Sequence, residues 1–287
     1  MHLPFLFQSS TLLALIGLGI LWTYRSCSFL NISLGALIVI GGFLFDAFYA
    51  GDLFSAFIAL SVTLTLCGAV NLVFHFGLFN RLRRSRATSS TLLLSSFGLY
   101  IVLENVLALI TGSKTIAPSL TLAWPFSNGN SLGLTNLEWL FSIGTLGSLL
   151  VLEIMLFYST WGMALRAVSE NFELAAVSGV NSRRVQSTAA FGSGVAAGLV
   201  GIFSTLNTGI TASDGMNLII SGAVAAILGG LGSISGLLFS AMVIATLQQA
   251  TVYYLGAQWR DLFTFGALFL VLYAFRHRLF GGGVYSW

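Results

Sequence analysis

The stretch SGAVAAILGGLGSISGLLFSAMVIATLQQA, residues 221–250, decides the fold class, because it holds two apolar runs and no charged side chain. Its centre, AILGGLGSISG at residues 226–236, resembles a dinucleotide-binding glycine loop, whose glycines let the backbone approach a pyrophosphate. That loop needs a preceding strand and a following acidic residue, and the next acid here is Asp261. The small residues instead favour two closely packed membrane helices. We assign helix packing to Gly222, Gly229, Gly230, Gly232 and Gly236.

The composition of the whole chain is that of a membrane protein. Of its 287 residues, 7% are charged and 56% are hydrophobic, whereas a soluble domain has about 25% charged residues. The mean hydropathy is +0.93, and the apolar runs do not alternate as barrel strands do. Because lipid cannot satisfy backbone polar groups, we predict an all-α fold, a polytopic integral membrane helix bundle.

About eight or nine transmembrane helices are expected, with broken or re-entrant segments among them. Apolar stretches of about 20 residues match the thickness of a hydrocarbon core. Nine candidates lie near residues 5–24, 30–50, 53–77, 88–112, 138–158, 187–208, 216–233, 236–256 and 261–275. Only Ser-Ile-Ser separates the seventh from the eighth, so we expect one of them to be short, tilted or re-entrant. Residues 1–287 are predicted to form one transmembrane domain.

Basic side chains predict the orientation, because they favour cytoplasmic loops. With the N-terminus outside and the C-terminus in the cytoplasm, all basic residues except Lys114 and Arg260 fall inside. The first ten residues lack the Lys or Arg of a secretory signal peptide, so this segment is predicted to be retained. The net charge of +3 indicates topology and contact with membrane lipid, with no nucleic acid as partner. We expect a multi-pass protein of a bacterial-type cytoplasmic (inner) membrane.

The sequence contains no recognisable catalytic or metal-binding constellation. Cys27 and Cys67 lie in apolar settings and are predicted to be buried, while the three histidines lie far apart in the sequence. The segment TGSKT, residues 111–115, ends like a phosphate loop, but Ser113 precedes Lys114 where that motif has glycine. We therefore predict no catalytic residue, no metal site and no cofactor on this chain, and no enzymatic activity.

Polar side chains inside the spans are costly in lipid and often line a pathway. The candidates are Asp46, Asn71, Glu104, Asn105, Gln248 and Gln249, of which Glu104 is the deepest acid. Asn31 and Ser33 add hydrogen-bonding groups if the second span is broken at its start. We assign the substrate path to Asn31, Ser33, Glu104 and Gln248. For each of them, an interhelical hydrogen bond that only fixes packing is an equally good alternative.

The connection TWGMALRAVSENFELAAVSGVNSRRVQ, residues 160–186, is the most charged part of the chain. Apolar residues recur at helical intervals from Leu165 to Ala176, with charges on the other faces, so one amphipathic helix is predicted. Gly179 is expected to end it in a left-handed conformation, and Asn181 to cap the next helix. Such a helix lies on lipid or docks into a groove on a partner.

A weak internal repeat links the two halves of the sequence. Asn31, Gly35-Ala36 and Gly41-Gly42 recur as Asn217, Gly222-Ala223 and Gly229-Gly230. In the predicted topology the two copies cross the membrane in opposite directions, as an inverted repeat does. Chance similarity between glycine-rich helices is the alternative.

Several segments, in order, resemble the permease subunits of branched-chain amino-acid-type (Liv-type) ABC importers. They are RAVSENFELAAVSGVNSRRV, GLVGIFSTLNTGI, SGAVAAILGGLGSISG and the run from WRDLF to RHRLFGG. The resemblance implies a permease that forms the translocation path with a second homologous permease subunit. It also implies two cytoplasmic ATP-binding subunits, which would hold ATP and Mg, and an extracytoplasmic solute-binding protein.

The resemblance also assigns residue roles. In that family a cytoplasmic region, here about residues 160–185, contacts the ATPase, which implies coupling roles for Arg166, Glu170, Glu173, Ala176, Gly179 and Asn181. The chain departs from the family where relatives usually have Asn-Phe-Ala-His-Gly-Glu, because residues 31–36 are NISLGA and lack the His and Glu. Branched-chain or other amino acids are therefore the leading solutes, with urea, short amides and small carboxylates as alternatives. An autonomous ion-coupled carrier and a purely structural membrane subunit also stay open.

Overall fold

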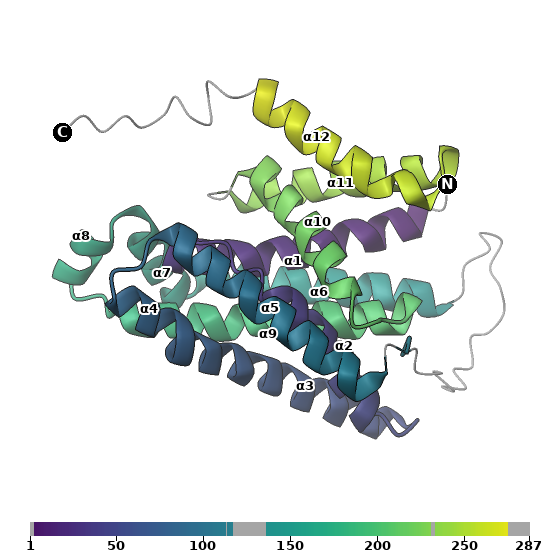
Figure 1. The fold of residues 1–287 in the computed structure, drawn as a ribbon, viewed down its shortest axis with the longest axis horizontal. Helices are drawn as coiled ribbons and strands as arrows, with labels where there is room; N and C mark the ends of the chain where they lie inside the picture. The colour runs from purple at the N-terminus through teal and green to yellow at the C-terminus, as the bar shows by residue number, and fades with distance from the viewer. Residues whose placement is uncertain (1–2, 113, 117–135, 231–232, 275–287) are drawn as a thin grey trace.

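The computed structural model describes residues 3–112, 114–116, 136–230 and 233–274, and Figure 1 shows them as a bundle of helices. The helices are α1 (Leu3–Cys27), α2 (Leu34–Phe48), α3 (Leu53–Phe74), the π-helical turn η1 (His75–Phe79), α4 (Asn80–Arg84), α5 (Ser89–Thr111), α6 (Asn136–Tyr158), α7 (Thr160–Glu170), α8 (Phe172–Val177), α9 (Ser182–Thr208), α10 (Asp214–Gly229), α11 (Ile234–Tyr254), the 3-10 turn η2 (Ala257–Trp259) and α12 (Arg260–Ala274). Within these ranges, β pairing is limited to an isolated antiparallel bridge between Ile116 and Ile210. The predicted all-α fold is confirmed.

Each of the nine predicted spans contains a helix, but the helices differ in length. Five described helices are long and apolar enough to cross a membrane: Leu6–Cys27, Phe54–Arg84, Ser89–Thr111, Ser182–Thr208 and Ile234–Tyr254. Helices α2 and α10 have 15 and 16 residues, which is about 22 to 24 Å of helix and less than a 30 Å hydrocarbon core. We expected either the seventh or the eighth span to be short, and it is the seventh, α10. The prediction of a full-length second span is wrong, because α2 begins only at Leu34.

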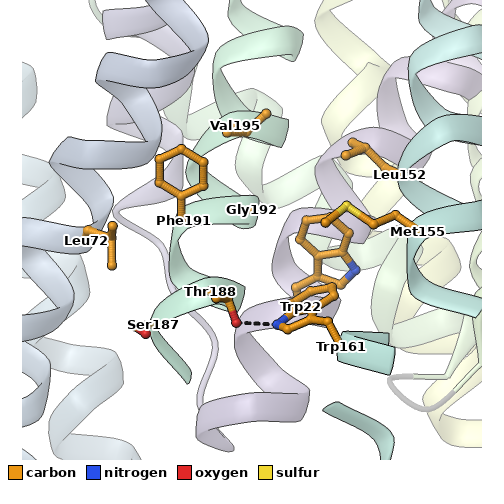
Figure 2. Close-up of a pocket in the computed structure, with 10 residues that line it drawn as sticks. All are labelled: Trp22, Leu72, Leu152, Met155, Trp161, Ser187, Thr188, Phe191, Gly192 and Val195. Carbon is orange, nitrogen blue, oxygen red and sulfur yellow. Dashed lines mark hydrogen bonds between the residues drawn. The ribbon is translucent and has the colours of Figure 1, made fainter. Parts of the chain in front are cut away.

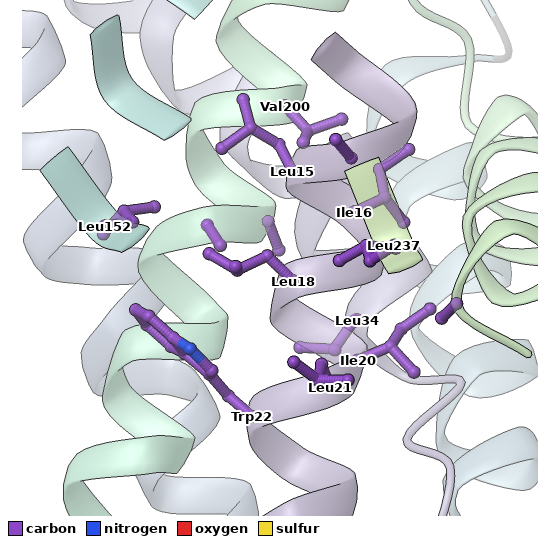
Figure 3. Packing of buried hydrophobic residues seen from close by; sticks show 14 of the residues in the cluster. Leu15, Ile16, Leu18, Ile20, Leu21, Trp22, Leu34, Leu152, Val200 and Leu237 are labelled. Carbon is purple, nitrogen blue, oxygen red and sulfur yellow. The ribbon is translucent and has the colours of Figure 1, made fainter. Parts of the chain in front are cut away.

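Helix α1 lies in the middle of the bundle and packs against α9, α11 and α10. Figure 3 shows Leu15 and Leu18 of α1 close to Val200 of α9, with Leu237 of α11 on another side of α1. Trp22, Leu18 and Leu15 are almost completely buried. Because lipid tails are as apolar as leucine, close packing of this kind, rather than exclusion of water, holds membrane helices together.

The helices α1–α2–α3 and α9–α10–α11 form two copies of one arrangement. Their short middle helices begin at Leu34 and Asp214, 180 positions apart. Helix α1 packs against α10 and α11, just as α9 packs against α2 and α3. The end of α1 meets the start of α9, where Gln186 Nε2 donates a hydrogen bond to the Ser26 carbonyl, so the two copies run in opposite directions. The structure therefore contains an inverted repeat.

The register of this repeat differs from the one predicted. The residues that precede the two short helices, Ser33 and Ser213, both have right-handed helical backbone angles. Aligning these two serines makes Gly35 equivalent to Gly215, whereas the sequence pattern paired it with Gly222. Repeated glycines in apolar helices are too common to define a register, and the positions of the helix starts define it here.

The connection between α6 and α9 contains two helices, so the prediction of one continuous amphipathic helix is wrong. Asn171 interrupts it with an extended backbone, φ −153° and ψ 109°, and its Oδ1 accepts a hydrogen bond of 3.0 Å from the Leu174 amide. This asparagine thereby ends α7 and caps α8. The two predicted signals that follow are confirmed, because Gly179 has φ +84° and Asn181 Oδ1 accepts from the Arg184 amide at 3.2 Å.

Candidate functional site

The starts of the short helices α2 and α10 meet beside the middle of α5. A Cβ atom added to Gly35 would lie 2.7 Å from the Gly215 carbonyl oxygen and 3.1 Å from Cε2 of Tyr100. Only glycine permits this approach, because the contact is with backbone. Tyr100 is buried at the middle of α5, a helix long enough to span the membrane. The two helix starts therefore lie near the centre of the hydrocarbon region.

A polar turn places the start of α2. Asn31 Oδ1 accepts hydrogen bonds from the Ser33 hydroxyl at 2.6 Å and from the Ser33 amide at 3.2 Å. The Ser96 hydroxyl of α5 accepts a hydrogen bond from the Ile32 amide at 3.2 Å. Asn31 and Ser33 are both buried. Their polar atoms thus hold the chain that leads into α2, and their assignment to the solute path stays a prediction.

A polar cavity of about 340 Å³ opens next to this meeting point. It lies between α5 and the chain that enters α10, and its lining residues are Glu104, Asn105, Ala108, Thr211, Ala212 and Ser213. We call it the polar cavity. Asp214 Oδ2 accepts a hydrogen bond of 2.7 Å from the Thr211 amide and so fixes the chain before α10. The first turn of α10 brings the positive end of its helix dipole and the negative charge of Asp214 beside this cavity, and the two oppose each other.

The polar cavity contains groups that sequence analysis missed. Thr211 and Ser213 lie between two predicted spans, where polar residues attract no attention. Tyr100, which lies one turn from Glu104 and outside the cavity lining, was also missed, although its surroundings include Glu104, Asp214 and the Met216 backbone. Its signal in the sequence is a four-residue spacing, since Ser96, Tyr100 and Glu104 recur on one helical face.

Gln248 lies in a different cluster, between α10, α11 and α12. Its Nε2 atom donates hydrogen bonds to Thr264 Oγ1 at 3.0 Å and to Ser221 Oγ at 3.4 Å. Its Oε1 atom accepts one from the Arg260 guanidinium at 2.9 Å. These are the interhelical bonds that the packing alternative predicts, and the residues that line the polar cavity do not include Gln248. Its assignment to the substrate path remains untested.

The glycines of the opening stretch lie where helices come closest. A Cβ atom on Gly222 would be 2.6 Å from Cβ of Ile16 in α1. Gly229 faces Gly236 across the turn between α10 and α11, and a Cβ atom on Gly229 would be 2.5 Å from the Gly236 carbonyl carbon. Gly230 makes this turn with φ +84°. Gly232 lies outside the described residues.

Most of the predicted coupling residues lie at one end of the bundle, which we call the basic end because Arg25, Arg83, Arg166 and Arg184 lie there. Helix α7 is anchored by Leu165 and Val168, which are buried in the core. Its Arg166 is close to Arg25, and Glu170 is exposed. Gly179 and Asn181 form the exposed link to α9. Glu173 and Ala176 belong to α8, and their side chains are outside the described part of the structure.

Helix α8 projects from the basic end, as Figure 1 shows. Its apolar residues Leu174 and Val177 are 65% and 86% exposed. Apolar side chains this exposed at the end of a bundle mark a surface that membrane lipid or another protein covers. Among the described residues, this surface is left open.

The chain is similar to known transport proteins over nearly its full length. Residues 3–272 match the profile of the family described as "Branched-chain amino acid transport system / permease component". The high-affinity branched-chain amino acid permease LivH of Escherichia coli is 28% identical over 277 residues, 90% of this chain and 88% of the relative. BraD of Pseudomonas aeruginosa is 28% identical over 276 residues, with the same coverage of 90% and 88%.

An archaeal relative extends this pattern. A probable branched-chain amino acid permease, LivH of Methanocaldococcus jannaschii, is 26% identical over 267 residues, 91% of this chain and 82% of the relative. The matched region runs from α1 into α12 and includes both copies of the inverted repeat. The chain therefore belongs to the family of permease components of branched-chain amino acid transport systems, the membrane-spanning subunits of ABC importers.

Proposed function

We propose that this chain forms the translocation path of an ATP-driven importer for branched-chain or other amino acids. The observation that carries this proposal is the polar cavity beside the paired starts of α2 and α10. In transporters built from inverted repeats, solute sites lie near the bilayer midplane, where the ends of discontinuous helices point at charged groups of the solute.

The groups around the polar cavity suit an amino acid zwitterion. The Glu104 carboxylate offers a partner for the α-ammonium group, and the hydroxyl groups of Thr211 and Ser213 offer a hydrogen-bond donor for the α-carboxylate. The methyl groups of Ala108 and Ala212 leave room for an apolar side chain. The residues that stand where relatives have His and Glu, Leu34 and Ala36, are buried in the packed core and offer the cavity no polar group.

A second homologous permease subunit covers the open face of α5 in this proposal. Of the five described helices that are long and apolar enough to cross a membrane, α5 is the least buried. Its exposed side chains include Leu94, Val102 and Leu109. Asn105 is exposed on the same helix, next to Glu104 of the polar cavity. An amide and a carboxylate are costly against lipid tails. We therefore expect a protein partner or a water-filled path, rather than lipid, to face Asn105 and Glu104.

Two ATP-binding subunits, with ATP and Mg bound to them, dock at the basic end in this proposal. The basic end then faces the cytoplasm and the N-terminus lies outside, in agreement with the preference of arginine for cytoplasmic loops. Exposed Leu174 and Val177 of α8, together with the link through Gly179 and Asn181, supply the contact surface. ATP drives transport because it binds the two conformations of the complex with different affinities. The solute-binding protein docks at the opposite, extracytoplasmic end.

Uptake of labelled leucine by vesicles that contain the complete importer tests this function. Uptake is expected to require ATP, and Glu104→Gln is expected to lower it about tenfold or more, because a hydrogen bond to a charged group contributes about 1.5–3 kcal/mol. Asp46→Asn is the matched control, because it neutralises a carboxylate that does not line the polar cavity. Uptake by this chain alone, driven by an ion gradient, would instead identify an autonomous carrier.

Two further outcomes revise the proposal in defined ways. Full uptake in Glu104→Gln would remove the polar cavity from the path while leaving the importer role intact. ATP-dependent uptake of urea, a short amide or a small carboxylate, in place of leucine, would reassign the solute. A thermal-shift screen of the cognate solute-binding protein against the same compounds provides an independent identification of the solute.

A further inference from the structure

A second cavity, of about 550 Å³, lies between α1, α3, α6, α7 and α9. Figure 2 shows the rings of Trp22, Trp161 and Phe191 around it, with Leu72 and Leu152 on opposite sides. We call it the apolar cavity. Its volume is in the range of ligand sites in proteins, about 300–1,000 Å³. It is separate from the polar cavity, with which it shares no lining residue.

The wall that α9 contributes changes in polarity along its length. Arg184, Ser187, Thr188, Phe191 and Val195 follow one another at helical spacing and so share one face. From the basic end inward, this face presents a cation, two hydroxyl groups, an aromatic ring and an aliphatic side chain. The segment from Ser187 to Val195 is about 12 Å long at 1.5 Å per residue. The two ends of a phospholipid complement this face in order, since its phosphate suits the cation and its acyl chain suits the aromatic ring and the aliphatic side chain.

The hydrogen bonds around the apolar cavity do not favour a polar solute. Both hydroxyls in its wall donate to the Arg184 carbonyl, Ser187 Oγ at 3.0 Å and Thr188 Oγ1 at 2.8 Å. Thr188 Oγ1 also accepts the indole N–H of Trp161. A water molecule or an amino acid in the remaining space would lie among carbon and sulfur atoms, where polar groups are poorly satisfied.

The indole N–H of Trp22 is a further feature of this wall. The side chain is 1% exposed, and its Nε1 atom has no hydrogen-bond acceptor among the described residues. Trp22 lies one turn before Arg25, close to the basic end of α1. Because this atom is itself buried, Trp22 contributes ring surface to the apolar cavity and offers a ligand no hydrogen bond.

We propose that the apolar cavity binds one acyl chain of an anionic phospholipid, with the headgroup phosphate against Arg183 and Arg184. Both arginines are exposed where α9 begins at the basic end. Helix α7 adds Arg166 and Glu170, whose formal charges cancel, so the arginines of α9 set the sign of the charge at the mouth. Each basic residue near a membrane surface favours anionic lipid about fivefold.

Bound lipid also stabilises the position of α7 against the bundle. The rings of Trp22 in α1 and Trp161 in α7 meet edge to face with centroids 5.5 Å apart, and both rings line the apolar cavity. An acyl chain beside them fills the space between α7 and the bundle. This role concerns lipid binding by this chain and does not depend on which solute is transported.

Fluorescence quenching by lipids with brominated acyl chains tests the proposal. The full chain is placed in phosphatidylcholine nanodiscs after Trp124, Trp139, Trp259 and Trp287 are changed to phenylalanine, which leaves Trp22 and Trp161 as reporters. Brominated phosphatidylglycerol is expected to quench at a lower mole fraction than brominated phosphatidylcholine. Changing both Arg183→Gln and Arg184→Gln is expected to remove most of this preference, about fivefold per arginine. Lys114→Gln, at the other end of the bundle, is the matched charge control.

A second variant tests the cavity itself. Val195→Phe adds a ring to the wall and is expected to reduce quenching by both lipids, whereas Val243→Phe on the exposed side of α11 is expected to leave it unchanged. Equal quenching by the two lipids in the parent protein would overturn the proposal, as would a preference that persists without the two arginines. Quenching that is lost when the complete importer assembles would show that a protein partner, and not lipid, occupies the cavity.

Discussion

Gly194→Ala is expected to destabilise the contact between α9 and α3, although alanine is the better helix former. A Cβ atom at position 194 would lie 2.6 Å from the Cys67 carbonyl oxygen, 2.9 Å from Asn71 Cβ and 3.0 Å from Gly68 Cα. Ordinary contact begins at 3.4 Å, so the two helices have to separate by about 0.8 Å at this point. Backbone atoms cannot rotate out of the way, and the separation therefore loosens packing along the interface.

Two opposing contributions determine the size of this effect. Overpacking costs about 1–3 kcal/mol, and replacing glycine by alanine inside a helix returns about 1 kcal/mol. Gly98→Ala in α5 isolates the second contribution, because no atom lies within 4 Å of a Cβ atom there. The two variants are therefore expected to differ in free energy of unfolding by about 1–3 kcal/mol. Gly17→Ala is expected to fall between them, since it meets only the flexible side chain of Leu237.

Reversible unfolding of the full chain in mixed micelles, followed by circular dichroism and tryptophan fluorescence, measures these differences. The expected order of stability is Gly194→Ala below Gly17→Ala below Gly98→Ala. If Gly194→Ala were as stable as Gly98→Ala, the close approach of α3 and α9 would be refuted. The same argument for the other glycine contacts in the bundle would then be refuted as well.

Two further predictions concern coupling and packing. Gly179→Asp is expected to abolish solute-stimulated ATP hydrolysis by the complete importer without affecting membrane insertion, because it puts a side chain and a charge on a left-handed turn with φ +84°. The neighbouring variant Ser178→Asp is the charge control. Normal coupling in Gly179→Asp would remove this link from the docking surface. Asn71→Leu is expected to cost about 1 kcal/mol of unfolding free energy, because Asn71 Nδ2 donates to the Ala190 carbonyl at 2.7 Å and to Ser193 Oγ at 2.9 Å between α3 and α9. Asn105→Leu is its control in the same unfolding assay, since Asn105 Nδ2 donates within α5 to the Ile101 carbonyl, and equal stability of the two variants would count against the interhelical bonds.

Local chemistry predicted the caps around the coupling region better than the helices themselves. The left-handed turn at Gly179 and the cap at Asn181 depend on one or two residues each, and both signals were recognised in the sequence. The break at Asn171 was missed, because the apolar periodicity continues across it while the asparagine side chain caps α8. A periodic pattern cannot show which of two local hydrogen-bonding arrangements is the more stable.

The candidate site was predicted only in part. Glu104 stood out as an acid inside an apolar run, and it lines the polar cavity. Thr211 and Ser213 did not stand out, because polar residues between two spans are ordinary in a connecting loop. Gln248 had the same signal as Glu104 but bonds to Thr264, Ser221 and Arg260 in another cluster. Polarity within a span therefore indicates that a partner exists without identifying the partner.

The sequence by itself determined the solvent of this protein and its helical class. The free energy of transfer into lipid is close to a sum over residues. A composition of 7% charged and 56% hydrophobic residues therefore identifies a membrane protein without any coordinates. Only the tertiary structure decided that α2 and α10 are half-length helices whose starts meet at Gly35 and Gly215. That contact joins segments 180 positions apart in the sequence. Its geometry depends on how α2 and α10 pack against α9 and α1, and no local pattern in the chain encodes this packing.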